Sequence, residues 1–237
     1  MNIPKLPDCI VFDLDETMYE YKDANDFANR KLIEFLSTET SVDTKELIQA
    51  FDSSRKNVKK RLGNTGASHS RLLYLNEMMR ELQINPRPSF LLRAEQVFWS
   101  SYFQKMQLRK GLSEFIETAR HNKIQLILVS DLTLQIQLKK LVALNLDSSF
   151  DLIFVSEELG GDKETGRPGE ILLPMLDNKD CVWFVGDRTT DFIIHTAYNY
   201  FFNFGADFSE HGENIIQNPD YSKMKKWLEL GISKVSS

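Results

Sequence analysis

A pair of aspartates follows the first apolar run of the chain. Asp13 and Asp15 come directly after Ile10, Val11 and Phe12 and stand two residues apart. Because side chains alternate along a strand with a period of two, both carboxylates point to the same side. In an open parallel sheet, ligands bind beyond the carboxyl ends of the strands, so we expect both groups at the floor of a crevice. Two close anions need a counter-charge, and a hard cation such as Mg2+ supplies it while neutralising phosphate oxygens during transfer.

A second pair of aspartates follows another apolar run, from Val182 to Val185. Gly186 allows a sharp turn at the end of this run, and Asp187 and Asp191 then stand four residues apart. We expect a helix to begin here, with both carboxylates on one of its faces. The two strand ends together predict an acidic pocket for a metal ion.

Phosphate binding also needs a hydrogen-bond donor and a cation. Ser130 follows the apolar run from Ile124 to Val129, which brings a hydroxyl to the same edge of the expected sheet. The Gly-rich loop over residues 160–168 carries Lys163 and Arg167, and either cation suits a phosphoryl oxygen. We favour Lys163 because it lies closer to the preceding apolar run.

These four segments, in this order at strand ends, resemble the haloacid dehalogenase superfamily of phosphatases. The family pattern is DxDx[TV], then Ser or Thr, then Lys, then GDxxxD, and the chain matches it at residues 13–17, 130, 163 and 186–191. An insertion between the first and second motifs is similar to the helical cap of that family, which closes over the active site and selects the substrate. Asp15 favours the phosphatases and phosphomutases over the dehalogenases, which lack an aspartate at this position.

The resemblance implies a role for each matched residue. Asp13 is expected to attack phosphorus as the nucleophile, and Asp15 to act as acid and base toward the leaving group and water. Ser130 and Lys163 are expected to hold the transferring phosphoryl group. The third motif of the family often reads Lys-Pro, whereas here the proline follows Arg167, so Arg167 remains an alternative cation.

The same resemblance implies one cofactor, Mg2+. Its expected ligands are the carboxylate of Asp13, the main-chain carbonyl of Asp15 and the carboxylate of Asp187, with Asp191 in support. Carboxylate and carbonyl oxygens are the donors that this hard cation prefers.

Five short apolar runs have the character of buried strands. They are nearly continuous in apolar residues and are separated by helical patterns, which is typical of a parallel sheet covered on both faces. The predicted strands are Cys9 to Asp13, Ile124 to Val129, Leu152 to Val155, Cys181 to Val185 and Tyr200 to Phe204. The sequence therefore predicts an α/β fold with a Rossmann-like, doubly wound parallel sheet.

Two helical patterns between these runs each carry one apolar stripe, and both stripes are predicted to face the core. Their members are Leu112, Phe115, Ile116 and Ala119 in the first helix and Leu134, Leu138, Leu141 and Val142 in the second. A last helix, from Tyr221 to Leu230, is predicted to close the core.

Residues 21–106 form a long insertion with helical spacing and no convincing strand. A crossover between parallel strands needs far fewer residues, so we expect an all-α helical cap domain here, beside a catalytic core of residues 1–20 and 107–237. The predicted helices of the cap are Ala24 to Ser37, Thr44 to Arg61, Ser68 to Leu82 and Ser89 to Lys105.

Several side chains of the insertion are candidates for contact with a ligand. His69 and Arg71 follow a glycine-containing loop, and we interpret them as substrate-specificity residues. The basic run at residues 55–61 is interpreted as a solvated helix face, and the aromatic residues at 99–103 as core, because each pattern is more often structural.

The composition limits the classes of protein that this chain represents. With 237 residues, 42% of them hydrophobic and 27% charged, it is typical of a globular protein. A net charge of -5 gives no global attraction to nucleic acid or to an anionic membrane, whereas a small phosphorylated substrate suits a local site. Cys9 and Cys181 lie in apolar runs without a metal-binding pattern, so we expect buried thiols. The N-terminus lacks a secretory pattern, so a cytoplasmic location is expected; the oligomeric state is not indicated.

We therefore expect an Mg2+-dependent phosphatase that acts on a small phosphorylated metabolite, such as a sugar phosphate, through an aspartyl-phosphate intermediate. A phosphomutase would use the same four motifs and differ in passing the phosphoryl group to a second substrate hydroxyl. A non-catalytic binding or regulatory module on this fold is a further alternative, against which the intact motif residues argue.

Overall fold

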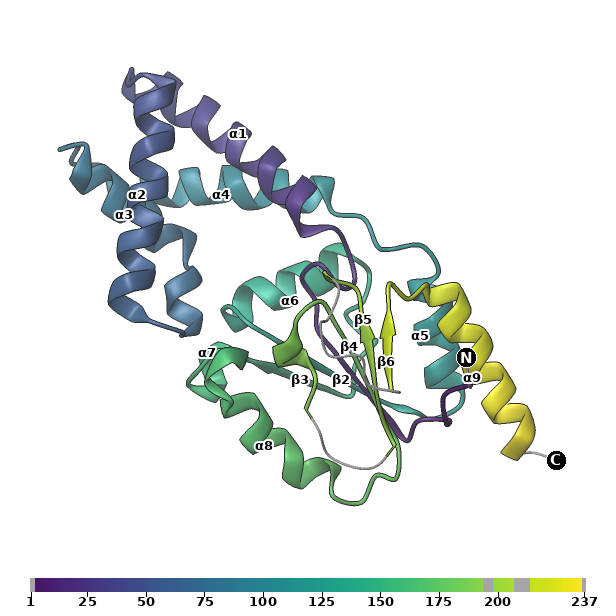
Figure 1. Cartoon of the computed structure of the whole chain (residues 1–237). Coiled ribbons are helices and arrows are strands. Elements are labelled where there is room, and N and C mark those ends of the chain that lie inside the picture. Colours follow the sequence, from purple (N-terminus) through teal and green to yellow (C-terminus); the bar gives the residue numbers. More distant parts are fainter. Residues whose placement is uncertain (1–2, 194–197, 207–213, 236–237) are drawn as a thin grey trace. The chain divides into compact units, whose positions relative to one another are not determined.

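The computed structural model describes residues 3–193, 198–206 and 214–235 (Figure 1). By its internal contacts the chain divides into two compact units: a core unit, Met1–Glu20 with Gln107–Ser237, and a helical unit, Tyr21–Met106. Among the described residues, no helix is both long and apolar enough to cross a bilayer.

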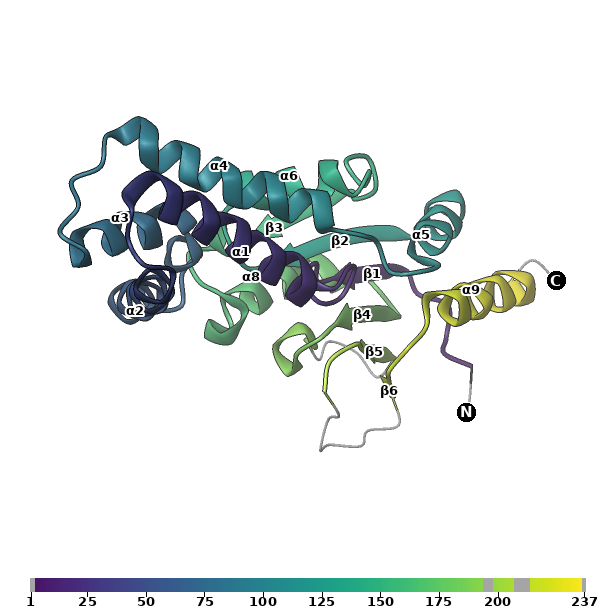
Figure 2. The same ribbon diagram turned by 90° about the horizontal axis from the view of Figure 1, so that it is seen from above.

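The core unit is built on a parallel sheet. Within the described part of the chain, six strands lie in the order β3-β2-β1-β4-β5-β6 (Figure 2). The elements of this unit are β1 Cys9–Phe12, α5 Leu112–His121, β2 Gln125–Ser130, α6 Leu134–Ala143, β3 Leu152–Val155, α7 Ser156–Leu159, η2 Lys163–Thr165, α8 Arg167–Leu176, β4 Val182–Gly186, η3 Thr189–Asp191, β5 Asn199–Asn203, β6 Ile215–Gln217 and α9 Tyr221–Val235, where η marks a 3-10 helix. The predicted Rossmann-like α/β fold and its five predicted strands are confirmed, with bounds that differ by at most one residue.

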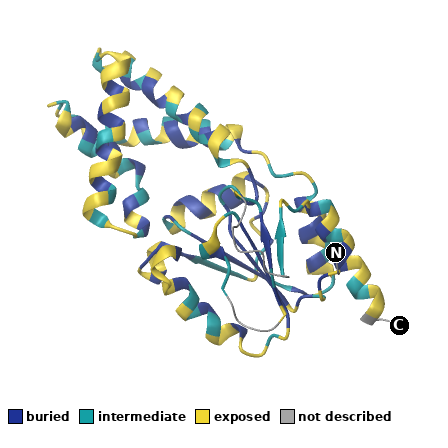
Figure 3. Cartoon of the chain, in the orientation of Figure 1, coloured by how far each residue is buried: buried dark blue, intermediate teal, exposed yellow. Residues whose placement is uncertain are grey.

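The strands present apolar side chains to both faces of the sheet. On one face Val11, Ile127 and Phe184 lie in register and pack with Leu172 of α8. On the opposite face the ring of Phe115 from α5 stacks on Trp183 of β4, with 6.4 Å between the ring centroids. The sheet interior is accordingly buried on both sides, as the dark blue strands of Figure 3 show. This explains why the strands read as nearly continuous apolar runs.

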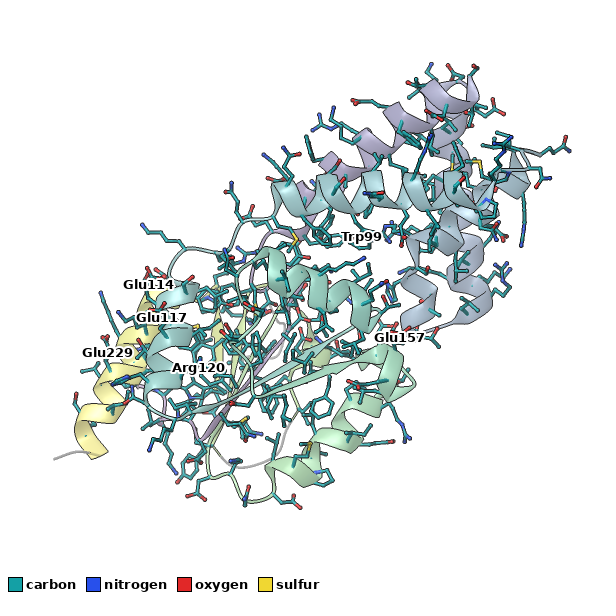
Figure 4. The ribbon with its side chains drawn as sticks, turned by 180° about the vertical axis from the view of Figure 1, so that it is seen from behind. Trp99, Glu114, Glu117, Arg120, Glu157 and Glu229 are labelled. Carbon is teal, nitrogen blue, oxygen red and sulfur yellow. The ribbon has the colours of Figure 1, made fainter. Side chains whose placement is uncertain are left out.

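Helices α5 and α9 pack against each other and keep their charged side chains outside. Figure 4 labels Glu114, Glu117 and Arg120 on α5 and Glu229 on α9, all of which are exposed. The apolar stripe predicted for α5 is buried, which confirms that prediction. Such a division between a buried and a charged face is what an amphipathic helix on a sheet requires.

The stripe predicted for α6 was wrong in three of its four positions. Leu134, Leu138 and Val142 are 36%, 41% and 62% exposed, while Gln137 and Lys140 are fully buried. An apolar repeat indicates which side of a helix prefers the core, but contacts made by specific polar groups can outweigh it. Here both buried polar side chains have partners at the sheet edge, as described below.

The helical unit consists of helices alone within its described residues. Its elements are α1 Tyr21–Thr40, α2 Thr44–Leu62, η1 Gly66–His69, α3 Arg71–Glu81 and α4 Pro88–Lys105. Helix α2 begins where Asp43 accepts a hydrogen bond from the amide of Lys45, and α3 begins where Ser70 accepts one from Leu73. The four predicted helices are present, the third of them broken into η1 and α3.

Candidate active site

The carboxyl ends of the parallel strands bring the predicted chemical groups to one edge of the sheet. Asp13 follows β1, Ser130 ends β2 and Asp187 follows β4, and these strands are hydrogen-bonded neighbours. Strand β3 leads through α7 to η2, which begins at Lys163. Parallel topology therefore gathers groups that lie far apart in the sequence.

Three carboxylates form a compact cluster at this edge. Oxygens of Asp13, Asp187 and Asp191 all lie within 4.8 Å of one another. The ammonium of Lys163 donates hydrogen bonds to Asp13 Oδ1 and, over 2.6 Å, to Asp191 Oδ1. Since the side chain of Lys163 is only 6% exposed, these contacts are shielded from water.

The crowding of acidic groups changes their ionisation. Burial, together with Asp191 and Asp187, raises the pKa of Asp13 well above its ordinary value, although Lys163 opposes this. Burial and the neighbouring Asp191 raise the pKa of Asp187 to about 6. Burial would lower the pKa of Lys163, but Asp13 and Asp191 raise it further, so the lysine stays protonated. One ammonium does not balance three carboxylates, and the cluster favours additional positive charge.

The loop after β4 differs from the helix that we expected there. Among the described residues, a single 3-10 turn, Thr189–Asp191, follows the strand. The carboxylate of Asp191 folds back and accepts hydrogen bonds from the amides of Asp187 and Arg188, over 3.0 and 2.9 Å. A Cβ on Gly186 would lie 2.3 Å from the Asp191 side chain, so only glycine fits at this strand end. The turn places the Asp191 carboxylate directly beside Asp187.

The first loop is tied to the rest of the core unit. The hydroxyl of Thr17 donates to Asp13 Oδ2 over 3.0 Å, which orients that carboxylate. Tyr221 of α9 donates to the carbonyl of Thr17 over 3.0 Å. Glu16 adopts a left-handed backbone with φ of 66°, and its carbonyl accepts a hydrogen bond from Arg109 over 2.8 Å. These contacts hold a turn that a non-glycine residue rarely adopts.

Asp15 is not part of the carboxylate cluster, and its side chain pairs with a different cation, the ammonium of Lys140. The ammonium of Lys140 lies 2.7 Å from each of its carboxylate oxygens, and the hydroxyl of Tyr19 donates to Oδ1. Burial would raise the pKa of Asp15, but the Lys140 charge and these hydrogen bonds together hold it below its ordinary value. Asp15 is therefore a carboxylate in this arrangement.

Two polar residues of α6 were missed by the sequence analysis, namely Gln137 and Lys140. The amide of Gln137 donates to Ser130 Oγ over 2.7 Å and to the carbonyl of Asp131 over 2.6 Å. The signal that could have found them is their spacing of three residues on a helix that directly follows Ser130. We instead assigned the apolar side of α6 to the core.

The loop that carries Lys163 is anchored to the end of β2. Asp131 accepts a hydrogen bond from the Lys163 amide over 3.0 Å. The other candidate cation, Arg167, is exposed and pairs with Glu170 over 2.7 Å. Of the two, Lys163 is the one whose side chain contacts Asp13.

His69 and Arg71 lie within the helical unit. The Arg71 guanidinium is buried and donates to Tyr21 Oη over 3.1 Å and to Asn25 Oδ1 over 3.2 Å. It also lies over the ring of Phe98, 4.8 Å from its centroid. These contacts give Arg71 partners inside its own unit. A specificity role for His69 and Arg71 stays a prediction.

The carboxylate cluster suits a hard divalent cation. All of its donor groups are oxygens, and their spacing allows them to share one ion. The raised pKa values of Asp13 and Asp187 reflect their burial first and the neighbouring carboxylates second. The residues that would hold Mg2+ are Asp13, Asp187 and Asp191. The carboxylate of Asp15 is engaged by Lys140, which leaves its main-chain carbonyl as the group for the ligand role that we expected.

Known sequences resemble this chain over the span that carries these motifs. The chain matches the haloacid dehalogenase-like hydrolase family over residues 10–200, a span that includes every motif described above. The ribulose-1,5-bisphosphate 5-phosphatase of Halopiger xanaduensis is 30% identical over 171 residues, which are 72% of this chain and 72% of that relative.

Solved structures show the same fold. A 2-haloacid dehalogenase from Pseudomonas syringae pv. Tomato superposes with a TM-score of 0.65 at 16% identity, covering 96% of this chain and 99% of that chain. The hydrolase YfnB from Bacillus subtilis, bound to magnesium, gives a TM-score of 0.57 at 16% identity, covering 95% of this chain and 99% of that chain. At these identities the likeness concerns the fold alone.

Proposed function

This chain belongs to the haloacid dehalogenase-like hydrolases, and we propose that it is an Mg2+-dependent phosphatase that passes a phosphoryl group through the side chain of Asp13. One observation carries this proposal: carboxylate oxygens of Asp13, Asp187 and Asp191 lie close enough together to share one cation. The ammonium of Lys163 contacts two of these residues, Asp13 and Asp191. A nucleophile, an oxygen-rich cation site and a phosphate-binding ammonium are the parts that phosphoryl transfer requires.

In the first half-reaction an oxygen of Asp13 attacks phosphorus, and the bond from phosphorus to the leaving oxygen breaks. Thr17 holds the other carboxylate oxygen, which fixes the direction of attack. Lys163 and Ser130 bind the phosphoryl oxygens and offset the charge that they carry. A cation held by Asp13, Asp187 and Asp191 would supply further neutralisation of these oxygens.

In the second half-reaction a water attacks phosphorus and the bond to Asp13 breaks, which releases inorganic phosphate. Asp15 carries the proton for both halves. It takes one from the attacking water as a carboxylate and delivers it to the oxygen of the next leaving group as a carboxylic acid. Each turnover thus returns Asp13 and Asp15 to their starting states.

We further propose that the substrate is a sugar phosphate. The support is the relative from Halopiger xanaduensis, whose name gives ribulose 1,5-bisphosphate as its substrate. The exposed guanidinium of Arg188, beside Asp187, offers positive charge at the edge of the site for such an anionic compound. By the resemblance stated above, the helical unit is the part of the chain that selects one sugar phosphate over another.

A screen of sugar phosphates tests the proposal. We expect release of inorganic phosphate in the presence of Mg2+, its loss in EDTA, and no isomerised sugar phosphate among the products. Asp13→Asn is expected to abolish release without changing the melting temperature greatly. An isomerised product would indicate a phosphomutase, and equal release by the wild type and Asp13→Asn would contradict the proposal.

A further inference from the structure

Helix α6 turns two polar side chains inward and an apolar stripe outward. Gln137 and Lys140 have no exposed surface, whereas Leu134, Leu138 and Val142 lie on the outer side. Burial of an ammonium is unfavourable unless a partner offsets it, and an apolar pair of similar volume would fill the space without that cost. The chain therefore retains an arrangement that packing alone does not favour.

The partners of the buried lysine are specific. Its ammonium reaches both oxygens of Asp15 at 2.7 Å, while the main contacts of Gln137, one helical turn away, are Ser130 Oγ and the carbonyl of Asp131. A donor that contacts both oxygens fixes the plane of the carboxylate as well as its place. Helix α6 thus contacts the proposed acid/base residue closely through Lys140 and, over 3.4 Å, through Gln137, whose shorter contact is with the proposed phosphate-binding hydroxyl.

The helix itself is held in place at its first turn. The carboxylate of Glu157, labelled in Figure 4, accepts a hydrogen bond from the amide of Leu134 over 2.9 Å. Next to it, Ser156 accepts one from the amide of Leu132 over 2.9 Å. A carboxylate at the start of a helix also interacts favourably with the helix dipole. Because its start is fixed, α6 can set the position of the Lys140 ammonium.

We propose that Lys140 is a positioning residue that holds the Asp15 carboxylate in the orientation in which it accepts the proton of the attacking water. This inference rests on the proposed function. It assigns Lys140 to the second half-reaction, because an ammonium that donates to both oxygens of Asp15 orients the group that must accept the proton of the water. Loss of Lys140 should then slow the release of phosphate from Asp13 more than it slows the first attack.

The test is Lys140→Met, which keeps an unbranched side chain of similar length and removes the ammonium, measured with p-nitrophenyl phosphate and with phenyl phosphate. We expect kcat to fall by roughly 10²-fold, the scale of general acid–base catalysis, and to become equal for the two substrates because they share the second step. The ratio kcat/KM for p-nitrophenyl phosphate, which reports the first half-reaction, should fall far less. In acid-quenched enzyme the fraction that carries a phosphoryl group on Asp13 should rise.

Lys139→Met is the matched control, because Lys139 is the exposed neighbour on the same helix, and its kinetics should equal those of the wild type. A parallel fall of kcat and kcat/KM in Lys140→Met, without a rise in trapped phosphoryl enzyme, would overturn the positioning role. Wild-type enzyme that neither releases phosphate nor forms a phosphoryl enzyme would instead overturn the proposed function, and this inference with it.

A double variant keeps the test decisive if Lys140→Met does not fold. Asp15→Asn with Lys140→Met removes both charges, so no unpaired ion is left buried. If Lys140 acts only through Asp15, the double variant should have the same kcat as Asp15→Asn alone. A further fall in kcat would show that Lys140 acts on another group and would contradict the inference.

Discussion

The core unit and the helical unit both bury a cation, but they surround it with different groups. In the core unit Lys163 contacts two carboxylates, Asp13 and Asp191, at the carboxyl edge of the sheet. In the helical unit Arg71 contacts a phenol, an amide oxygen and the face of Phe98, all of them uncharged. A buried ammonium among carboxylates at a ligand-binding edge can exchange partners with an incoming anion. The Arg71 guanidinium instead links α3 to α1 and α4 through these neutral contacts.

The largest effect should come from the nucleophile. Asp13→Asn removes the attacking oxygen and is expected to lower kcat by at least roughly 10³-fold, because no other carboxylate of the cluster contacts both Thr17 and Lys163. Phosphate release from p-nitrophenyl phosphate measures this. The control is Asp147→Asn, an exposed aspartate of the same unit, which should remain within about twofold of the wild type.

The next effect distinguishes the two cations of one loop. Lys163→Met should lower kcat/KM by roughly 10²-fold or more, since it removes the ammonium that offsets phosphoryl charge. Arg167→Met should change it by less than about twofold, because the Arg167 guanidinium is exposed and pairs with Glu170. The values of kcat/KM from steady-state kinetics of both variants show which cation binds the phosphoryl group. A larger loss in the arginine variant would assign phosphate binding to Arg167 instead.

The acidic cluster should show a dependence on pH in its affinity for metal. Burial and Asp191 raise the pKa of Asp187 to about 6, so below this pH a proton occupies an oxygen that the cation needs. The dissociation constant for Mg2+ should therefore rise by about tenfold per pH unit below that value. Calorimetric titration with Mg2+ on either side of this pH gives the slope. Asp187→Asn should bind Mg2+ weakly with a flatter pH profile, and an unchanged profile would remove Asp187 from the site.

The smallest effect on catalysis should come from the helical unit. Arg71→Met removes the buried guanidinium and should lower the free energy of unfolding by about 2 kcal/mol, through lost hydrogen bonds and ring contacts. Turnover of p-nitrophenyl phosphate by the folded variant should be unchanged. Thermal unfolding of this variant beside the exposed control Arg80→Met measures the difference. If Arg71→Met instead increases KM for a sugar phosphate and leaves the stability unchanged, Arg71 contacts the substrate. The buried cations of the two units would then both bind ligand, which would contradict this difference between the units.

The sequence was most informative where one physical signal dominated. The strands of the core unit could be predicted because each is buried on both faces and therefore apolar throughout. Strand β6 was missed because it has three residues, Ile215–Gln217, at the edge of the sheet. The motif aspartates could be predicted because strand ends in a parallel sheet converge on one edge.

Other features depend on contacts that no local pattern encodes. The buried side of α6 is determined by Asp15 and Ser130, which precede it by up to 125 residues in sequence. The turn after β4 is determined by the Asp191 carboxylate, which folds back on the amides of Asp187 and Arg188 and replaces the helix that we expected. For α6 a polar contact between specific atoms outweighed the periodicity of the apolar residues, and after β4 such a contact outweighed the helix expected from the spacing of Asp187 and Asp191.

The most direct test of the account is whether Asp13 becomes phosphorylated during turnover. Wild-type enzyme, mixed with p-nitrophenyl phosphate and Mg2+ and quenched with acid, should yield a peptide that contains Asp13 and carries the mass of one added phosphoryl group. Asp13→Asn, treated in the same way, should yield the unmodified peptide. Phosphate release by wild-type enzyme with the added group on another residue, or with none at any time during turnover, would contradict the central role of Asp13.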